Sequence, residues 1–77
     1  HDSVERCARW LLMAHDRVCR DTFDLSHEYL AMMVGVRRPT ATLAAGELQK
    51  AGLIRYRRGK MEIVDREGLE RVSCECY

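Results

Sequence analysis

Residues 26–50 read SHEYLAMMVGVRRPTATLAAGELQK, and they predict two helices joined by a short turn. The first residue of this stretch, a serine, suits a helix N-cap, so a helix is predicted over residues 27–34. Gly35 ends that helix, because glycine adopts the left-handed conformation at a helix end at little cost. A second helix is predicted over residues 39–50, with its proline at the first helical position and Arg38 as the N-cap. Two helices joined by so short a turn are typical of a helix-turn-helix unit.

The apolar side chains of both predicted helices recur at spacings of three and four, which places them on one face of each helix. The buried faces are expected to hold Leu30, Ala31 and Val34 in the first helix and Ala41, Ala44, Ala45 and Leu48 in the second. Alanine side chains are small and permit close helix approach. The outer face of the second helix is left with Thr40, Thr42, Gly46 and Gln49.

Another helix is predicted ahead of this pair, over residues 2–19. Its apolar stripe consists of Val4, Cys7, Ala8, Leu11, Leu12, His15 and Val18. Asp2 followed by Glu5 suits a capping box at its start. Residues 23–25 then alternate apolar, polar and apolar, which predicts a very short strand.

A β-hairpin is predicted over residues 53–64, with a two-residue turn at Arg58 and Gly59. This turn pairs Arg57 with Lys60, Tyr56 with Met61, Arg55 with Glu62 and Ile54 with Ile63. The pairing gathers the apolar side chains on one face and the charged ones on the other. A slip by one residue would mix the two faces, so the register is well specified.

Asp65 can cap a final short helix that carries Leu69 and Val72, before a tail over residues 73–77. Together these elements predict a mainly α fold with a small antiparallel β-sheet, a winged helix-turn-helix, in a single domain over residues 1–77. The chain has 77 residues, 47% of them hydrophobic and 32% charged, which is an ordinary globular composition. Its length is near the lower limit for a domain that folds without disulfides or a bound metal.

The net charge of +1 hides a strong asymmetry along the chain. Residues 37–60 carry seven basic side chains and one acid, a charge of +6, whereas the other residues carry six basic and eleven acidic side chains, a charge of −5. The basic residues are Arg37, Arg38, Lys50, Arg55, Arg57, Arg58 and Lys60. Such clustering creates a local positive field that suits a polyanion. The plainer interpretation is a solvated charged face.

Several classes of protein have little support in this sequence. No apolar run approaches the roughly 18–20 residues of a membrane span, and the start at His1 lacks the layout of a signal peptide. We therefore expect a cytoplasmic protein without membrane contact, and the missing Met suggests a piece of a longer chain. No nucleophile with a neighbouring base, phosphate-binding glycine loop or paired carboxylates are evident, so no catalytic residues are predicted.

The cysteines are expected to be reduced thiols, because four are too few for a disulfide-dense miniprotein. They are Cys7, Cys19, Cys74 and Cys76. Cys74 with Cys76, and His15 with Cys19, each offer two metal ligands. Neither pair has a second half at zinc-site spacing, so no metal site is predicted.

The strong cationic features lie on elements that could touch a nucleic-acid duplex. Arg37 and Arg38 precede the second helix of the pair, where free amides and the helix dipole favour anions. Arg57, Arg58 and Lys60 crowd the tip of the hairpin. A helix fits the major groove of DNA, and a basic hairpin beside it can reach the backbone. The alternative from another class is a winged domain that docks proteins or dimerises without binding DNA.

The whole chain resembles the C-terminal winged helix-turn-helix domain of bacterial regulators in the Crp/Fnr superfamily. The resemblance rests on FDLSHEYLAMMVGVRRPTATLAAGELQKAGLIRYRRGKMEIVD and on the closing DREGLE. It implies that residues 39–50 form the recognition helix and residues 57–60 the wing that contacts the DNA backbone. In this family an N-terminal sensor domain binds a small effector such as a cyclic nucleotide, and a long helix forms a homodimer. Neither part is in this sequence, so no cofactor is expected within it.

The resemblance also implies roles for individual residues. Arg38 matches the position whose arginine commonly reads guanine, and the other DNA-contacting matches are Ser26, His27, Arg37, Thr40, Thr42, Arg58 and Lys60. With Arg57, at the same basic hairpin tip, nine residues are predicted to contact DNA. The implied partners are double-stranded DNA and, for the whole regulator, RNA polymerase. Pro39 and Leu43 stand where the family often has a glutamate and a second arginine, so the familiar target sequence is not expected.

Overall fold

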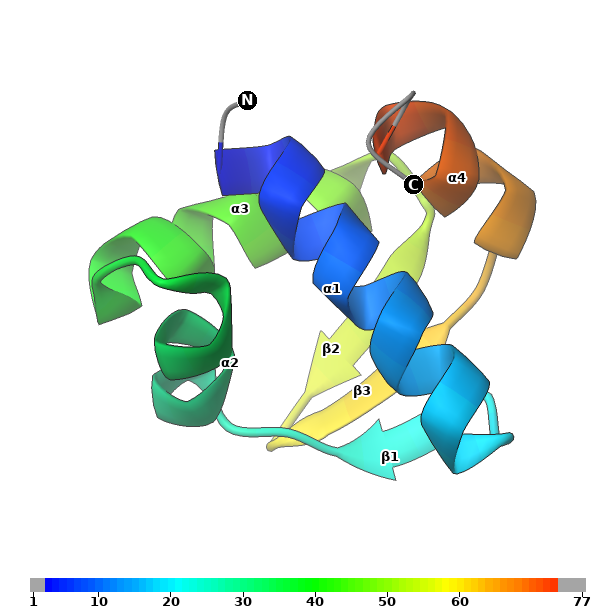
Figure 1. Cartoon of the computed structure of the whole chain (residues 1–77), viewed down its shortest axis with the longest axis horizontal. Coiled ribbons are helices and arrows are strands. Elements are labelled where there is room, and N and C mark those ends of the chain that lie inside the picture. The colour runs from blue at the N-terminus through cyan, green and yellow to red at the C-terminus, as the bar shows by residue number, and fades with distance from the viewer. Residues whose placement is uncertain (1–2, 74–77) are drawn as a thin grey trace.

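Seven elements follow one another in the computed structural model, which describes residues 3–73 (Figure 1). They are α1 (Ser3–Val18), β1 (Thr22–Asp24), α2 (His27–Val34), α3 (Arg38–Lys50), β2 (Ile54–Arg57), β3 (Lys60–Ile63) and α4 (Arg66–Ser73). The predicted fold class, mainly α with a small antiparallel sheet, is therefore confirmed. The expected cap at Asp2, and Cys74 and Cys76, lie outside the described residues.

The helix-turn-helix pair follows from its caps. Ser26 accepts a hydrogen bond of 3.0 Å from the backbone N–H of Tyr29, and Gly35 ends α2 at φ 84°. α3 starts one residue earlier than predicted. Its N-cap is Arg37, whose carbonyl accepts the first helical hydrogen bond at 3.0 Å, so Arg38 already belongs to the first turn. The predicted cap at Arg38 is wrong because proline disfavours but does not forbid a helical residue before it.

The hairpin has all four of the predicted residue pairs. Arg58 at φ 51° and Gly59 at φ 78° form the turn, a conformation that matches the twist of the flanking strands. β3 is the middle strand, because β1 pairs with its other edge in the order β1-β3-β2. β1 covers residues 22–24 and not 23–25. It ends where β3 begins, and Leu25 donates instead to the carbonyl of Gly59 at 2.7 Å.

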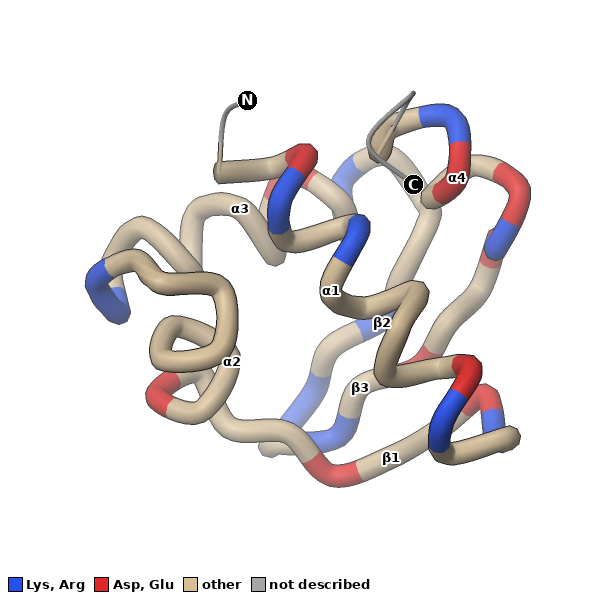
Figure 2. Tube along the Cα trace, in the orientation of Figure 1, with Lys and Arg blue, Asp and Glu red and all other residues tan. Residues whose placement is uncertain are grey.

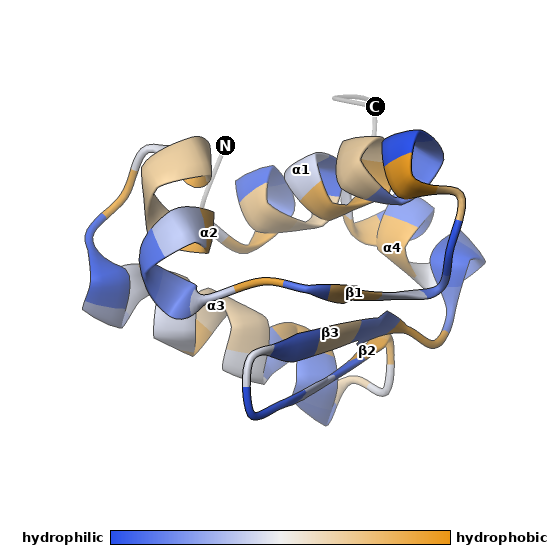
Figure 3. Cartoon of the chain, turned by 90° about the horizontal axis from the view of Figure 1, so that it is seen from below, coloured by the Kyte–Doolittle hydropathy of each residue, from blue (hydrophilic) through white to orange (hydrophobic). Residues whose placement is uncertain are grey.

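The core lies between the sheet and the helices, which cover one of its faces (Figure 3). Its largest fully buried aliphatic side chains come from five elements and are Leu11, Leu12, Leu30, Leu48, Met61 and Leu69. Val18, predicted in the apolar stripe of α1, is 40% exposed, because the helix ends there and Cys19 turns away at φ 59°.

The last described helix, α4, begins with a side-chain cap. Asp65 accepts a hydrogen bond of 3.0 Å from the N–H of Gly68, as predicted for the start of α4. Ser73 belongs to α4 and not to a tail, and its buried hydroxyl donates to the carbonyl of Glu70 at 3.0 Å. Within residues 3–73, no helix has the length and hydropathy that crossing a bilayer requires.

Candidate nucleic-acid interface

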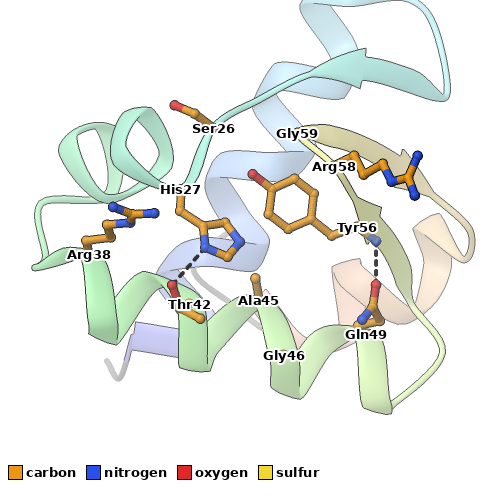
Figure 4. Close-up of a pocket in the computed structure, with 10 residues that line it drawn as sticks. All are labelled: Ser26, His27, Arg38, Thr42, Ala45, Gly46, Gln49, Tyr56, Arg58 and Gly59. Carbon is orange, nitrogen blue, oxygen red and sulfur yellow. Dashed lines mark hydrogen bonds between the residues drawn. The ribbon is translucent and has the colours of Figure 1, made fainter.

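A groove of about 480 Å³ separates the outer side of α3 from the hairpin (Figure 4). We call it the α3–hairpin groove, and its polar lining residues are Ser26, His27, Arg38, Thr42, Gln49, Tyr56 and Arg58. Ala45, Gly46 and Gly59 complete its walls. Three stretches of the chain therefore meet here: the start of α2, the length of α3 and the hairpin turn.

Hydrogen bonds and one ring contact hold the walls of this groove together. The hydroxyl oxygen of Thr42 lies 2.8 Å from Nδ1 of His27, and the His27 ring lies against that of Tyr56 with centroids 4.5 Å apart. Tyr56 donates its hydroxyl to the carbonyl of Leu25 and its backbone N–H to the side-chain oxygen of Gln49. The latter bond occupies the open edge of β2. The hairpin is thus fastened to α3 and to the start of α2.

Gln49 and Tyr56 are site residues that the sequence did not reveal. Gln49 was expected only on the outer face of α3, and Tyr56 only on the apolar face of the hairpin. Only the tyrosine hydroxyl could have indicated a role for Tyr56, because a half-buried hydroxyl needs a hydrogen-bond partner.

The surroundings of His27 and Tyr56 shift the pKa values of both side chains. Burial, together with the positive charge of Arg38, lowers the pKa of His27 below its usual 6.5. Burial raises the pKa of Tyr56 above 10.0, although Arg38 acts in the opposite direction. At neutral pH the lining of the groove therefore holds a neutral imidazole and a neutral phenol, and its positive charge comes from arginines.

Two arginines stand at opposite ends of the groove. Arg38 lies in the first turn of α3, with a side chain 65% exposed, and its guanidinium is 4.0 Å from the carboxylate of Glu28. Arg58 occupies the hairpin turn and forms no ion pair with any of residues 3–73. Both guanidiniums are thus available to an anion that lies along the groove.

The other basic side chains of the hairpin belong to a second concave surface. Arg55, Arg57 and Lys60 lie with Arg58 around a hollow of about 360 Å³ on the outer face of the sheet. Lys60 is 2.9 Å from Asp24 on β1, and Arg55 is 3.3 Å from Glu62. The cations expected at one wing tip are therefore divided between two surfaces, and Arg58 lines both. Figure 2 shows the basic positions along β2 and at the start of β3.

Arg37, Thr40 and Ser26 are predicted site residues whose surroundings differ from those of the arginines in the groove. Arg37 is exposed at the start of α3 but lines neither hollow, and Thr40 is half-buried on the side of α3 away from the groove. Ser26 lines the groove, with its hydroxyl oxygen engaged by the N–H of Tyr29. The groove thus brings together Ser26, His27, Arg38, Thr42 and Arg58, and leaves out Arg37, Thr40, Arg57 and Lys60.

An apolar groove lies elsewhere, between α1, β1 and α2. It has a volume of about 470 Å³, and its apolar lining includes Trp10, Met13, Phe23, Tyr29 and Met33. The rings of Trp10 and Tyr29 meet edge to face, with centroids 6.1 Å apart. Of the nine predicted DNA-contacting residues, none lines it.

The histidine and cysteines of α1 have structural surroundings. Arg66 donates to Nδ1 of His15 at 2.9 Å, so Nε2 carries the proton and donates to Asp21 at 2.8 Å. Cys19 donates to the carbonyl of Asp16 at 3.4 Å, and burial raises the pKa of the Cys7 thiol to about 12. Among residues 3–73, no three His, Cys, Asp or Glu side chains gather as metal ligands would.

By sequence, the chain is similar to domains of known transcriptional regulators. The profile of the Crp-like helix-turn-helix domain matches residues 5–72. The transcriptional regulator SdrP of Thermus thermophilus is 34% identical over 61 residues, which are 79% of this chain and 30% of that protein.

Solved structures agree in fold. The catabolite activator protein of Thermus thermophilus superposes with a TM-score of 0.87 at 25% identity, over 92% of this chain and 33% of that one. A crp/fnr-family regulator from Eubacterium rectale superposes with a TM-score of 0.86 at 28% identity, over 91% of this chain and 32% of that one. The chain spans about a third of the length of these relatives.

Proposed function

Because this chain belongs to the family of Crp-like helix-turn-helix domains, a non-enzymatic class, we propose that it binds double-stranded DNA in a sequence-specific manner. In this proposal α3 enters the major groove, and the hairpin turn contacts the sugar–phosphate backbone beside it. The observation that carries the proposal is the α3–hairpin groove, which has an exposed arginine at each end and a helix N-terminus at its wall.

The groove has the chemistry that a phosphodiester strand requires. Arg38 and Arg58 supply charge at its two ends, and the hydroxyl of Thr42 lies between them. The N-terminus of α2 adds backbone N–H groups and the positive end of a helix dipole. Contacts of this kind position a protein on a duplex but carry no sequence information, which must come from α3.

Titration of a mixed-sequence duplex at two salt concentrations tests this proposal against the docking alternative. Each phosphate neutralised by a basic side chain releases counterions, so DNA affinity should fall steeply between about 50 mM and about 200 mM salt. A module that docks proteins through an apolar surface would retain no duplex at either concentration. That result would reject DNA binding.

The wing contributes to the salt dependence through Arg58 more than through Lys60. Replacing Arg58 with alanine is expected to weaken binding evenly across sequences and to reduce the slope of log affinity against log salt by about one unit. The Lys60→Ala change should have a smaller effect, because Asp24 at 2.9 Å already neutralises part of the Lys60 charge. Equal slopes for the wild type and both variants would remove the hairpin from the interface.

Affinity should also depend on pH through His27. The pKa of His27 is lowered in the free protein, and phosphates that approach the groove would raise it. Binding then takes up a proton, so affinity increases as pH falls below about 6.5 at constant ionic strength. Fluorescence anisotropy of a labelled duplex measures this, and the His27→Gln variant should show a flatter profile.

The same lowered pKa requires a folding control. Unfolded His27 binds protons more readily than folded His27, so the free energy of unfolding decreases as pH falls through this range. Circular dichroism at each pH ensures that only folded protein is compared. Identical pH profiles for the wild type and His27→Gln would exclude His27 from the interface.

The remaining proposals concern a longer regulator of which this domain would form one part. We propose that this domain acts within a cytoplasmic homodimer whose sensor domain binds a small effector such as a cyclic nucleotide, and that RNA polymerase is a further partner. Two domains related by two-fold symmetry would read two half-sites about one helical turn apart. The isolated chain is therefore expected to bind a duplex weakly.

A further inference from the structure

Leu43 is more exposed than any other large apolar side chain of residues 3–73, at 72%. It lies near the middle of α3, between Thr42 and Ala44. At 100° per residue, it points about 150° away from the centre of the buried face of the helix. That buried face consists of Ala41, Ala44, Ala45 and Leu48. Leu43 is also absent from the lining of the α3–hairpin groove, so it occupies the outward ridge of the helix.

Two of the neighbours of Leu43 on this ridge have no side-chain hydrogen-bonding group. Pro39 is four residues before it and Gly46 three residues after it, so both lie on the same side of the helix. A Cβ atom added at Gly46 would have nothing within 4 Å. The ridge is thus apolar at Leu43 and low at Gly46. Polar side chains flank it on both sides, Arg38 and Thr42 towards the α3–hairpin groove and Thr40 and Glu47 away from it.

A major groove offers one apolar feature to such a ridge, the 5-methyl group of thymine. Against any other base edge, a leucine covers donors and acceptors and gives them no partner, which costs free energy. We propose that Leu43 determines specificity by selecting thymine at one position of the bound duplex, through packing on its methyl group. This inference rests on the proposed function.

The test begins with selection from a randomised duplex library at low salt. Wild-type protein is expected to enrich one position for thymine, and the Leu43→Ala variant is expected to lose that enrichment alone. Leu43→Met, which keeps an apolar side chain of similar volume, should restore it. Met32→Ala is the matched control, because Met32 is 69% exposed on α2 and lies off the ridge. It should retain the preference of the wild type.

Removal of the methyl group itself completes a double-mutant cycle. Deoxyuridine in place of the selected thymidine keeps every hydrogen-bonding group and deletes only that methyl. It should lower wild-type affinity about fourfold, the effect of one buried methyl, and leave the affinity of Leu43→Ala unchanged.

Two results would overturn the inference, and they are distinguishable. Equal losses on deoxyuridine for the wild type and Leu43→Ala, or the same enriched sequence for both, would show that Leu43 reads no methyl although the domain binds DNA. Failure of the wild type to retain any duplex at low salt would instead reject the proposed function, and the inference with it.

Discussion

Replacing Arg38 with alanine is expected to weaken binding to the preferred duplex by about 1–3 kcal/mol and to relax base preference at one position. Arg38 lies in the first turn of α3, the part of a recognition helix that reaches base edges. Its side chain is 65% exposed and 4.0 Å from an even more exposed Glu28, an ion pair too weak to hold the guanidinium. The planar guanidinium can therefore form two parallel hydrogen bonds with guanine.

The Arg38→Lys variant separates charge from geometry. Lysine keeps the positive charge but lacks the planar fork, so non-specific affinity should persist while discrimination between bases falls. Competition binding against duplexes changed at one base pair at a time measures both quantities. If Arg38→Ala weakens every duplex to the same extent, Arg38 contacts phosphate only.

Replacing Leu48 with alanine is expected to lower the free energy of unfolding by about 2–5 kcal/mol. Leu48 is 1% exposed and is the one large side chain on the buried face of α3, where its neighbours are alanines. Those alanines bring the backbones close but bury little apolar surface, so the attachment of α3 to the core depends on Leu48. Total stability of a small domain is about 5–15 kcal/mol, so the loss is a large share of it.

Leu43→Ala is the matched control for this prediction. It removes the same atoms from the same helix, but from a side chain that is 72% exposed, so the free energy of unfolding should change by at most about 0.5 kcal/mol. Urea unfolding followed by circular dichroism measures both variants. Similar midpoints for the two would mean that α3 is held mainly by contacts other than those of Leu48.

Local chemistry determined most of the fold. The hairpin register follows from a two-residue turn and an alternation with period two, which lie within a dozen residues of each other, and all four pairs agree. Neighbouring residues likewise determine the serine cap and the glycine end of α2. The same holds for the alanine face of α3. α3 begins one residue before the predicted start because the constraint that proline places on Arg38 is only a preference.

The tertiary structure alone decided how the candidate site is assembled. Tyr56 meets Leu25 across 31 residues, and Thr42 meets His27 across 15, so no local pattern connects them. The pairing of β1 with β3 brings Asp24 to Lys60 and leaves Arg58 as the wing cation that lines the α3–hairpin groove together with Arg38. Charge and propensity can be read from a sequence because they belong to single residues or short segments. Which charges share a groove depends on how distant segments pack, and that is a property of the folded chain.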